Sequence, residues 1–180
     1  PILIFEHIES SNAGLFELFL LEHSIPFQVR KPNQGDSIPQ SNELRNYSGL
    51  CFLGGIESVT EPTQAMLEEI ELVRAARTEG IPIIGHCLGG QLISKALGGE
   101  VTKQNQDEFG WSTIFANDNL TSRDWLANMP DKLFVMQWHS DAFTVPPDAY
   151  RILSGEFCSN QAFVLENILA MQFHVEIGSE

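Results

Sequence analysis

The stretch IPIIGHCLGGQLISKALGG, residues 81–99, decides the fold, because an apolar run meets a helical pattern at a single cysteine. Residues 81–84 predict a short buried strand, and residues 88–96 place apolar side chains at helical spacing before a glycine pair ends the helix. Cys87 lies in the corner between them, with a glycine two residues away on either side. This G-x-C-x-G pattern is typical of a nucleophile elbow in which cysteine replaces serine.

Each position of this corner has a separate physical reason. Glycines are needed on both sides because the backbone turns sharply and side chains there would collide with the neighbouring strand and helix. At a helix N-terminus, the macrodipole and the free N–H groups favour the thiolate form of Cys87 over the thiol. The backbone N–H of Leu88 is then free to stabilise an oxyanion. The alternative interpretation is a buried structural cysteine, which is the usual role of a free cysteine.

Strands and helices alternate along the first half of the chain. Short apolar runs predict strands over residues 1–7, 25–31, 49–55 and 81–85, and helical patterns cover residues 10–24, 61–80 and 88–96. Ser10, Ser11 or Asn12 would cap the first of these helices. In the second half we expect short strands over residues 110–117, 131–139, 149–153, 161–165 and 168–174, and one helix over 122–129. This alternation indicates a parallel sheet covered by helices on both faces, in one domain over residues 1–180.

Composition limits the partners of the chain. The formal net charge is −14, whereas nucleic acids and anionic membranes attract basic surfaces. No apolar run reaches membrane-spanning length, and the N-terminus lacks the basic region and cleavage site of a signal peptide. Three scattered cysteines, Cys51, Cys87 and Cys158, do not make a disulfide framework. We therefore expect a soluble cytoplasmic protein, trimmed at one or both ends, with no nucleic acid, membrane or cofactor among its partners.

The end of the chain offers a partner for the thiol in MQFHVE, residues 171–176. Side chains two residues apart on an extended strand point to the same side, so His174 and Glu176 can reach a common site. A thiolate nucleophile requires a base, and the base requires an orienting carboxylate. Two alternatives stay open. His174 could be an ordinary polar residue, or a metal could bind Cys87, His139, His174 and Glu176, although CxxC and HxxxH spacings are lacking.

The sequence resembles the class I glutamine amidotransferases over nearly its whole length. GHCLGGQ (85–91) and QFHVE (172–176) are similar to the family's G-x-C-x-G-x-Q and Q-F-H-P-E motifs, and CFLGGIESV (51–59) to its glycine-rich oxyanion loop. EFGW (108–111), QWHSDAFTVP (137–146) and CSNQAF (158–163) resemble the branch that contains the glutaminase domain of GMP synthetase and its free-standing relatives. Each piece is weak evidence alone, but all of them in this order are highly specific.

This resemblance implies a three-layer αβα sandwich with a mostly parallel central sheet and a flavodoxin-like core, in agreement with the alternation of elements. It implies that Cys87 attacks the carboxamide carbon of glutamine, that His174 acts as base and then as acid, and that Glu176 orients His174. Ammonia would leave, and water would hydrolyse the γ-glutamyl thioester to glutamate. The backbone N–H groups of Gly55 and Leu88 would form the oxyanion hole.

The resemblance also implies residues that bind the substrate. Gln91 and the segment Trp138, His139, Ser140 and Asp141 would hold the α-amino and α-carboxylate groups of glutamine. Two plainer interpretations stay open: Gln91 could only cap the elbow, and Trp138 could be a core residue.

The sequence departs from the family's pattern at two positions. Ile56 and Val175 stand where the family usually has proline. Proline fixes φ at about −65°, so its loss loosens a loop, but neither change removes a reacting group. We expect these changes to affect substrate preference more than activity.

The use of the ammonia is open at the level of sequence. The glutaminase-like domain occupies all 180 residues, so an acceptor would lie on a separate synthetase subunit. The first alternative is a free-standing γ-glutamyl peptidase or hydrolase that acts on another γ-glutamyl compound. The second is an inactive regulatory or binding module, against which the complete set Cys87, His174 and Glu176 argues.

Overall fold

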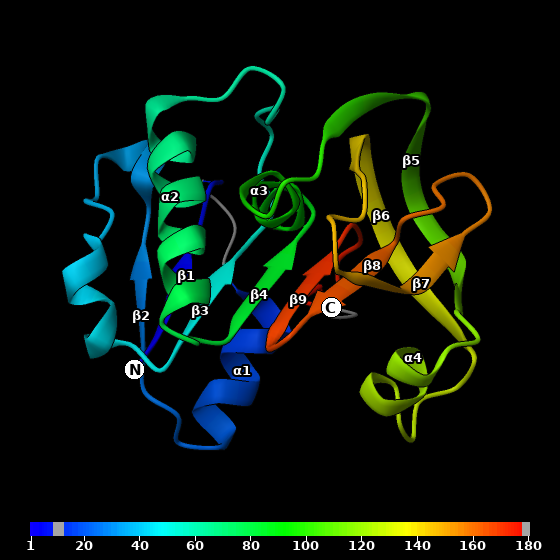
Figure 1. Cartoon of the computed structure of the whole chain (residues 1–180), viewed down its shortest axis with the longest axis horizontal. Coiled ribbons are helices and arrows are strands. Elements are labelled where there is room, and N and C mark those ends of the chain that lie inside the picture. The colour runs from blue at the N-terminus through cyan, green and yellow to red at the C-terminus, as the bar shows by residue number, and fades with distance from the viewer. Residues whose placement is uncertain (9–12, 178–180) are drawn as a thin grey trace.

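The structure, a computed structural model, describes residues 1–8 and 13–177 and arranges them around one sheet (Figure 1). Across the sheet the strands lie in the order β2 (Phe27–Arg30), β1 (Ile2–Phe5), β3 (Gly49–Phe52), β4 (Ile83–His86), β9 (Ile168–Met171), β8 (Ala162–Leu165), β7 (Tyr150–Gly155), β5 (Val101–Ala116) and β6 (Lys132–Phe143). The helices are α1 (Gly14–Glu22), α2 (Gln64–Thr78), α3 (Leu88–Ala96) and α4 (Leu120–Trp125), and short 3-10 turns cover Pro32–Gln34 and Ser41–Asn46.

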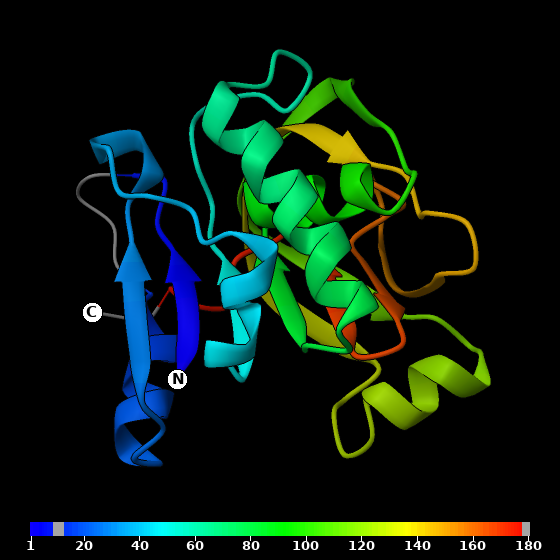
Figure 2. The same cartoon turned by 60° about the vertical axis from the view of Figure 1, so that its left-hand side comes forward.

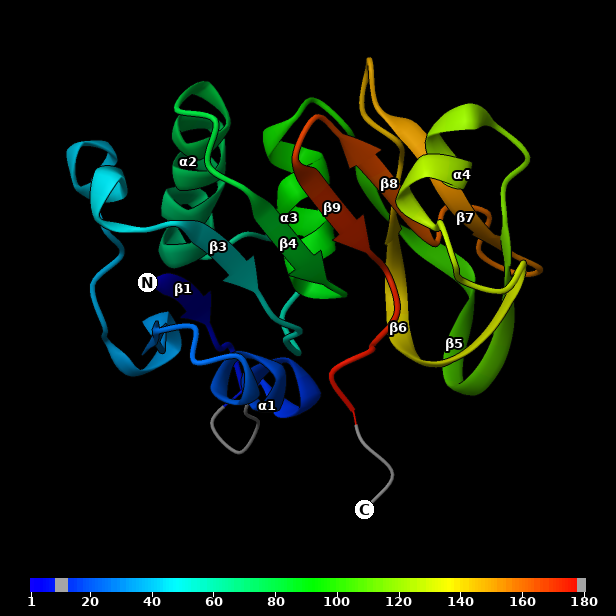
Figure 3. The same ribbon diagram turned by 90° about the horizontal axis from the view of Figure 1, so that it is seen from below.

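The sheet has a parallel part and an antiparallel part. Strands β2, β1, β3, β4 and β9 pair in parallel, and β9, β8, β7, β5 and β6 pair antiparallel. Viewed from below, α2 and α3 cover one face of the parallel strands and α1 covers the other (Figure 3). The predicted α/β class and its layers are therefore confirmed. Strand β2 forms one edge of the sheet, and α4 lies at the far end of the molecule from it (Figure 2).

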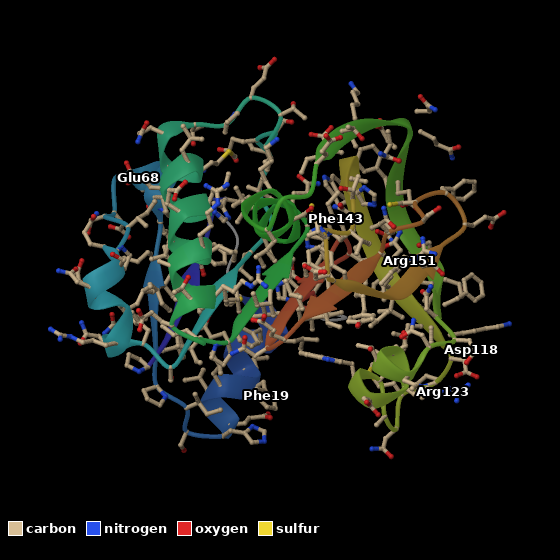
Figure 4. The ribbon with its side chains drawn as sticks, in the orientation of Figure 1. Phe19, Glu68, Asp118, Arg123, Phe143 and Arg151 are labelled. Carbon is tan, nitrogen blue, oxygen red and sulfur yellow. The ribbon has the colours of Figure 1, made fainter. Side chains whose placement is uncertain are left out.

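The parallel strands are buried on both faces, as their continuous apolar sequences predict. Leu3 and Phe5 of β1 pack in the core beneath α2 and α3, whereas Ile4 packs with Leu20 of α1 on the opposite face. In the centre of the molecule (Figure 4), Phe143 at the end of β6 packs edge to face against Phe163 of β8, although β7 and β5 separate these two strands in the sheet. One apolar core cluster therefore contains residues from both the parallel and the antiparallel part of the sheet, and it includes residues on both sides of the elbow between β4 and α3.

Strand β5 is much longer than predicted. The local pattern predicts a strand at residues 110–117, but β5 begins at Val101. Residues 102–107 are almost all polar and exposed, so they show no hydrophobic alternation. Thr102 and Lys103 pair with Ala142 and Asp141 of β6, pairing resumes where Glu108 meets His139, and residues 104–107 span the shift of register between these two points. The extended conformation of this segment depends on pairing with a strand that is distant in the sequence, and such pairing cannot be recognised from the local hydrophobic pattern.

The helices agree with the predictions in position and differ at their ends. Helix α2 begins after Thr63, whose side-chain oxygen accepts a hydrogen bond from the Met66 N–H at 3.2 Å. In α1 only Leu20 is fully buried, and Phe19 projects outward (Figure 4). The cap proposed at Ser10, Ser11 or Asn12 lies outside the described residues. Among the described residues, no helix combines the length and apolar character that crossing a membrane requires.

Candidate active site

Cys87 lies between the end of β4 and the start of α3, as the elbow pattern predicts. Its backbone has φ 50° and ψ −108°, a conformation that residues other than glycine rarely adopt, so the corner is strained. The Cys87 N–H donates to the Met171 carbonyl at 2.9 Å, and Sγ lies 3.5 Å from the Trp138 carbonyl oxygen. The turn therefore presents a thiol at the N-terminus of α3, between β9 and β6.

The two glycines of the elbow allow α3 to touch the sheet. A Cβ at Gly89 would lie 2.0 Å from the Phe52 carbonyl oxygen, and a Cβ at Gly85 would lie 2.6 Å from the Gly89 carbonyl carbon. Both obstacles are backbone atoms, which cannot rotate away as a side chain can. Only glycine therefore fits at these positions.

We expect Gly89→Ala to lower the free energy of unfolding by about 3 kcal/mol, because overpacking against fixed atoms costs this much. Gly49→Ala is the control, since its Cβ would meet only Ile2 Cδ1, at 2.8 Å, at the end of a flexible side chain. Urea unfolding followed by circular dichroism measures both variants. Equal stability of the two would contradict the close approach of α3 to the sheet.

His174 and Glu176 form a buried pair beyond the end of β9. The His174 N–H donates to the Met136 carbonyl at 2.9 Å, which ties this segment to β6. His174 Nδ1 and Glu176 Oε1 are 2.5 Å apart, and their side chains are 12% and 10% exposed. The sequence pattern predicts both residues on one face of a strand. The structure brings them together in an irregular segment after β9. The predicted contact between the two residues is therefore present, but the strand geometry from which it was predicted is not.

Gly54 lies between the thiol and the imidazole. A Cβ at Gly54 would be 2.8 Å from His174 Cε1 and 3.7 Å from Cys87 Cβ, so both side chains flank this glycine. Among the described residues, His174 Nε2 has no hydrogen-bond partner. Because Glu176 occupies Nδ1, Nε2 is the ring nitrogen available to Cys87. Thiol, imidazole and carboxylate thus follow one another in space.

The charges of this group support one another. Burial lowers the pKa of His174, but the interaction with Cys87 and the hydrogen bond with Glu176 outweigh burial and raise the pKa to about 10. Burial raises the pKa of Glu176, but the hydrogen bond with His174 and the nearby His86 outweigh this effect and hold the pKa below its ordinary value. At neutral pH the pair is therefore an imidazolium and a carboxylate.

The glycine loop after β3 packs on the start of α3. A Cβ at Gly55 would lie 2.3 Å from Leu88 Cδ2 and 2.9 Å from His7 Cβ. Leu88 is the first residue of α3, so its N–H has no acceptor within the helix. The structure thus packs Gly55, one predicted oxyanion donor, against the side chain of Leu88, the other, which directly follows Cys87 in the chain.

The segment Trp138 to Asp141 lies on β6 beside the thiol. Trp138 is 64% exposed, so it is not a core residue. His139 is buried, with Nδ1 3.0 Å from the Asp141 carbonyl oxygen and Nε2 3.0 Å from Glu108 Oε2. The Asp141 carboxylate accepts a hydrogen bond of 2.5 Å from Ser58 Oγ. The segment is therefore joined both to β5 and to the glycine loop.

Gln91 ties α3 to this segment. Its side-chain amide donates to the Asp141 carbonyl at 3.0 Å and lies 3.4 Å from Gln172 Oε1. Gln91 therefore does not cap the elbow, and it fixes the backbone at Asp141. The neighbouring Ser140 is half-buried.

Several residues that support the site carry no signal in the sequence that points to this role. One of them is Ser58, which binds Asp141. The others form a buried chain of hydrogen bonds, in which Gln161 Nε2 donates to Glu108 Oε2 at 3.1 Å and Gln137 Nε2 donates to Gln161 Oε1 at 2.9 Å. Gln137 Oε1 in turn lies 3.1 Å from His139 Nε2. These groups hold the His139 ring. Glu108 and Gln161 belong to the EFGW and CSNQAF motifs, but the sequences of these motifs do not indicate which residues Glu108 and Gln161 contact.

The other cysteines differ from Cys87 in their surroundings. Cys51 and Cys158 are free and buried. Burial raises the pKa of Cys51 well above its ordinary value and that of Cys158 to about 11, so both are thiols at neutral pH. Across residues 1–8 and 13–177, no three His, Cys, Asp or Glu side chains are grouped as a metal ion requires. The metal site considered above also loses His139, because both of its ring nitrogens have protein partners.

Known proteins resemble this sequence. The family described as class-I glutamine amidotransferase matches residues 19–180. One subunit of the glutamine-hydrolysing GMP synthase of Sulfolobus acidocaldarius is 34% identical over 139 residues, which cover 75% of this chain and 70% of that relative. The glutamine-hydrolysing GMP synthase of Neisseria meningitidis is 34% identical over 137 residues, and these cover 73% of this chain but only 25% of that protein.

Solved structures share the fold. A glutamine amidotransferase from Methylobacillus flagellatus superposes with a TM-score of 0.94 and 38% identity, over 99% of this chain and 71% of that one. A glutamine amidotransferase from Thermotoga maritima superposes with a TM-score of 0.87 and 31% identity, over 98% of this chain and 76% of that one. Both relatives contain residues beyond the part that matches.

Proposed function

Because this chain belongs to the class I glutamine amidotransferase family, we propose that it hydrolyses the side-chain amide of glutamine to glutamate and ammonia through a thioester on Cys87. One observation carries the proposal. A strained cysteine at a helix N-terminus and a histidine flank the same glycine, and the other ring nitrogen of that histidine bonds to a buried carboxylate. Covalent amide hydrolysis requires this order of nucleophile, base and orienting acid.

In the proposed mechanism, the Cys87 thiolate attacks the carboxamide carbon, and the C=O electron pair moves onto oxygen. The N–H groups of Gly55 and Leu88 donate to this oxyanion. The His174 imidazolium then protonates the amide nitrogen, the C–N bond breaks, ammonia leaves, and the thioester forms. Neutral His174 next takes a proton from water as its oxygen attacks the thioester, and the thiolate leaves from glutamate. Glu176 accepts the Nδ1–H bond throughout and stabilises the positive charge on the ring.

We assign substrate recognition to the segment 138–141 together with Gln91. The Asp141 carboxylate, held by Ser58, is a suitable partner for the α-ammonium group. Gln91 and His139 fix the backbone from which Asp141 and Ser140 face the substrate. The exposed Trp138 forms the rim of the site.

We further propose that the ammonia passes to a separate synthetase subunit. The Sulfolobus acidocaldarius relative is, by its name, one subunit of a GMP synthase, and this chain matches 70% of it. The net charge of −14 favours a basic docking face on the partner. The second candidate is a free-standing γ-glutamyl hydrolase. The exposure of Trp138 at the rim favours it, because an open rim has room for a larger γ-glutamyl compound.

We expect the isolated chain to hydrolyse glutamine with a kcat/KM below about 10⁴ M⁻¹s⁻¹, a value that is ordinary for a self-sufficient enzyme. The reason is the loop: Ile56 replaces proline and is 83% exposed, so the loop lacks the fixed φ that proline would give to the residue after Gly55. Steady-state kinetics on glutamine and on γ-glutamyl peptides, with Cys87→Ser as the blank, measures this.

A higher value on glutamine alone would contradict the need for a partner. Preference for a γ-glutamyl peptide would favour the free-standing hydrolase. Ile56→Pro is the matched variant and is expected to raise kcat on glutamine, because proline reduces the freedom of the loop.

A further inference from the structure

A second buried group of charges lies next to the glycine loop. His7 follows β1, Glu69 is on α2, and both are buried. His7 Nε2 is 3.0 and 3.2 Å from the two Glu69 carboxylate oxygens, and His7 Nδ1 is 3.1 Å from the Leu53 carbonyl oxygen. Both partners only accept hydrogen bonds, so both ring nitrogens donate and His7 is an imidazolium. The proposed chemistry at Cys87 does not use this ion pair.

The surroundings of His7 keep it charged. Burial lowers the pKa of His7, but the hydrogen bond and the charge of Glu69 outweigh burial and raise the pKa above its ordinary value. The Leu53 carbonyl and the Glu57 carboxylate, at the two ends of the glycine loop, act in the same direction. A buried ion pair is costly to desolvate, and apolar residues of similar size are often as stable. A role in placing neighbouring groups would explain why the chain has one here.

The first such group is the peptide between Leu53 and Gly54. The Leu53 carbonyl accepts hydrogen bonds from His7 and from the Gly89 N–H at 3.2 Å. A trans peptide is planar, so its C=O and N–H point in opposite directions. Holding the Leu53 carbonyl therefore fixes the direction of the Gly54 N–H, on the glycine that Cys87 and His174 flank.

Two more contacts reach the rest of the loop. A Cβ at Gly55 would lie 2.9 Å from His7 Cβ, so this glycine packs directly on the His7 side chain. Asn33 Nδ2 donates to the His7 carbonyl at 2.8 Å and to Glu57 Oε1 at 2.7 Å. His7 thus contacts the loop at its start and its middle, and Asn33 links it to the end.

We propose that His7, whose ring Glu69 anchors, is a positioning residue that holds the glycine loop, residues 53–57, in the orientation from which it donates to the oxyanion. This inference rests on the proposed function, in which the loop supplies one oxyanion donor. Neither residue touches a reacting atom. His7 acts through its bond to the Leu53–Gly54 peptide and through its packing against Gly55, the proposed oxyanion donor, and Glu69 acts through His7. Loosening the loop therefore weakens transition-state stabilisation and leaves substrate binding unchanged.

Two single variants separate positioning from simple pairing. In His7→Gln, the side-chain amide takes the place of Nε2 and still binds Glu69. It has no atom at the position of Nδ1, so the hydrogen bond to the Leu53 carbonyl is lost. In Glu69→Gln, neutral His7 keeps its Nδ1–H donor to Leu53. We expect His7→Gln to lower kcat roughly 10- to 100-fold with KM unchanged, since one oxyanion donor contributes about 10²-fold or more. Glu69→Gln is expected to stay close to the parent.

Amide hydrogen exchange over residues 53–59 gives a readout that does not depend on turnover. We expect faster exchange in His7→Gln and parent-like exchange in Glu69→Gln. Alkylation of Cys87 by iodoacetamide forms no oxyanion, so its rate is expected to stay at the parent value in both. Glu6→Gln is the matched control, because Glu6 precedes His7 and is buried but pairs with Lys31 Nζ at 3.0 Å.

Parent-like kcat and exchange in folded His7→Gln would overturn the proposal. If His7→Gln does not fold, the double variant His7→Leu/Glu69→Leu, which leaves no unpaired charge, replaces it with the same expected results. If the parent hydrolyses no γ-glutamyl amide at all, only the proposed function fails. Amide exchange then decides the positioning role by itself.

Discussion

Cys87→Ala is expected to lower kcat/KM on the γ-glutamyl substrate by about 10⁴-fold or more, because loss of the nucleophile removes the covalent route. Cys87 is the cysteine at the strained end of β4, at the N-terminus of α3 and beside His174. A glutamine-like electrophile such as diazo-oxo-norleucine is expected to label Cys87 alone, and peptide mapping of the adduct checks this.

Cys158→Ala is the matched control, since this thiol is also free and buried but has a pKa of about 11. It is expected to keep the turnover and the labelling of the parent. An adduct on Cys51 or Cys158 with Cys87 unmodified would refute the assignment of the nucleophile.

His174→Ala is expected to lower kcat roughly 10³- to 10⁴-fold while the protein stays folded, because the proton donor for the leaving ammonia is lost. Glu176→Gln is expected to lose less. Its amide oxygen still accepts the Nδ1–H bond but stabilises the imidazolium less well. His23→Ala, at the exposed end of α1, is the control and is expected to leave turnover unchanged. Full activity of His174→Ala would exclude the triad.

The pH profile tests the same pair. The folded-state pKa of His174, about 10, lies above the unfolded value of 6.5. The stability that its protonation contributes is therefore complete below pH 6.5 and is lost as the pH rises through about 10. Turnover is expected to fall over the upper part of this range, as the imidazolium is lost. In Glu176→Gln this alkaline limb is expected to move to lower pH, because the anion that raises the pKa is gone. An unmoved limb would show that Glu176 does not tune His174.

The elbow could be read from the sequence because its constraints are local. Gly85, Cys87 and Gly89 are within five residues, and the strand and helix on either side have their own periodicity. The parallel pairing of the first strands also followed from local patterns, since strands buried on both faces have continuous apolar sequences. These predictions needed no knowledge of distant contacts.

The polar contacts of the site could not be predicted in this way. His139 reads as a possible ligand in the sequence, yet its ring is occupied by Glu108 and Asp141. His7 showed no partner, although Glu69, 62 residues away, lies 3.0 Å from it. Residues 102–107 carry no strand pattern, and pairing of Lys103 and Glu108 with β6 on either side of a register shift places this segment in β5. In each case the partner is far away along the chain, and hydrogen-bonding groups carry no periodic signal.

The sequence by itself determined the α/β class, the thiol at a glycine-flanked turn, and the pairing of His174 with Glu176, because each depends on residues close together in the chain. Only the tertiary structure decided that these groups meet around Gly54, and that His174 lies beyond β9 and is tied to β6. It also decided that the glycine loop rests on a buried ion pair. The physical reason is that packing and burial fix the distances and the charge states of groups that the chain itself leaves far apart.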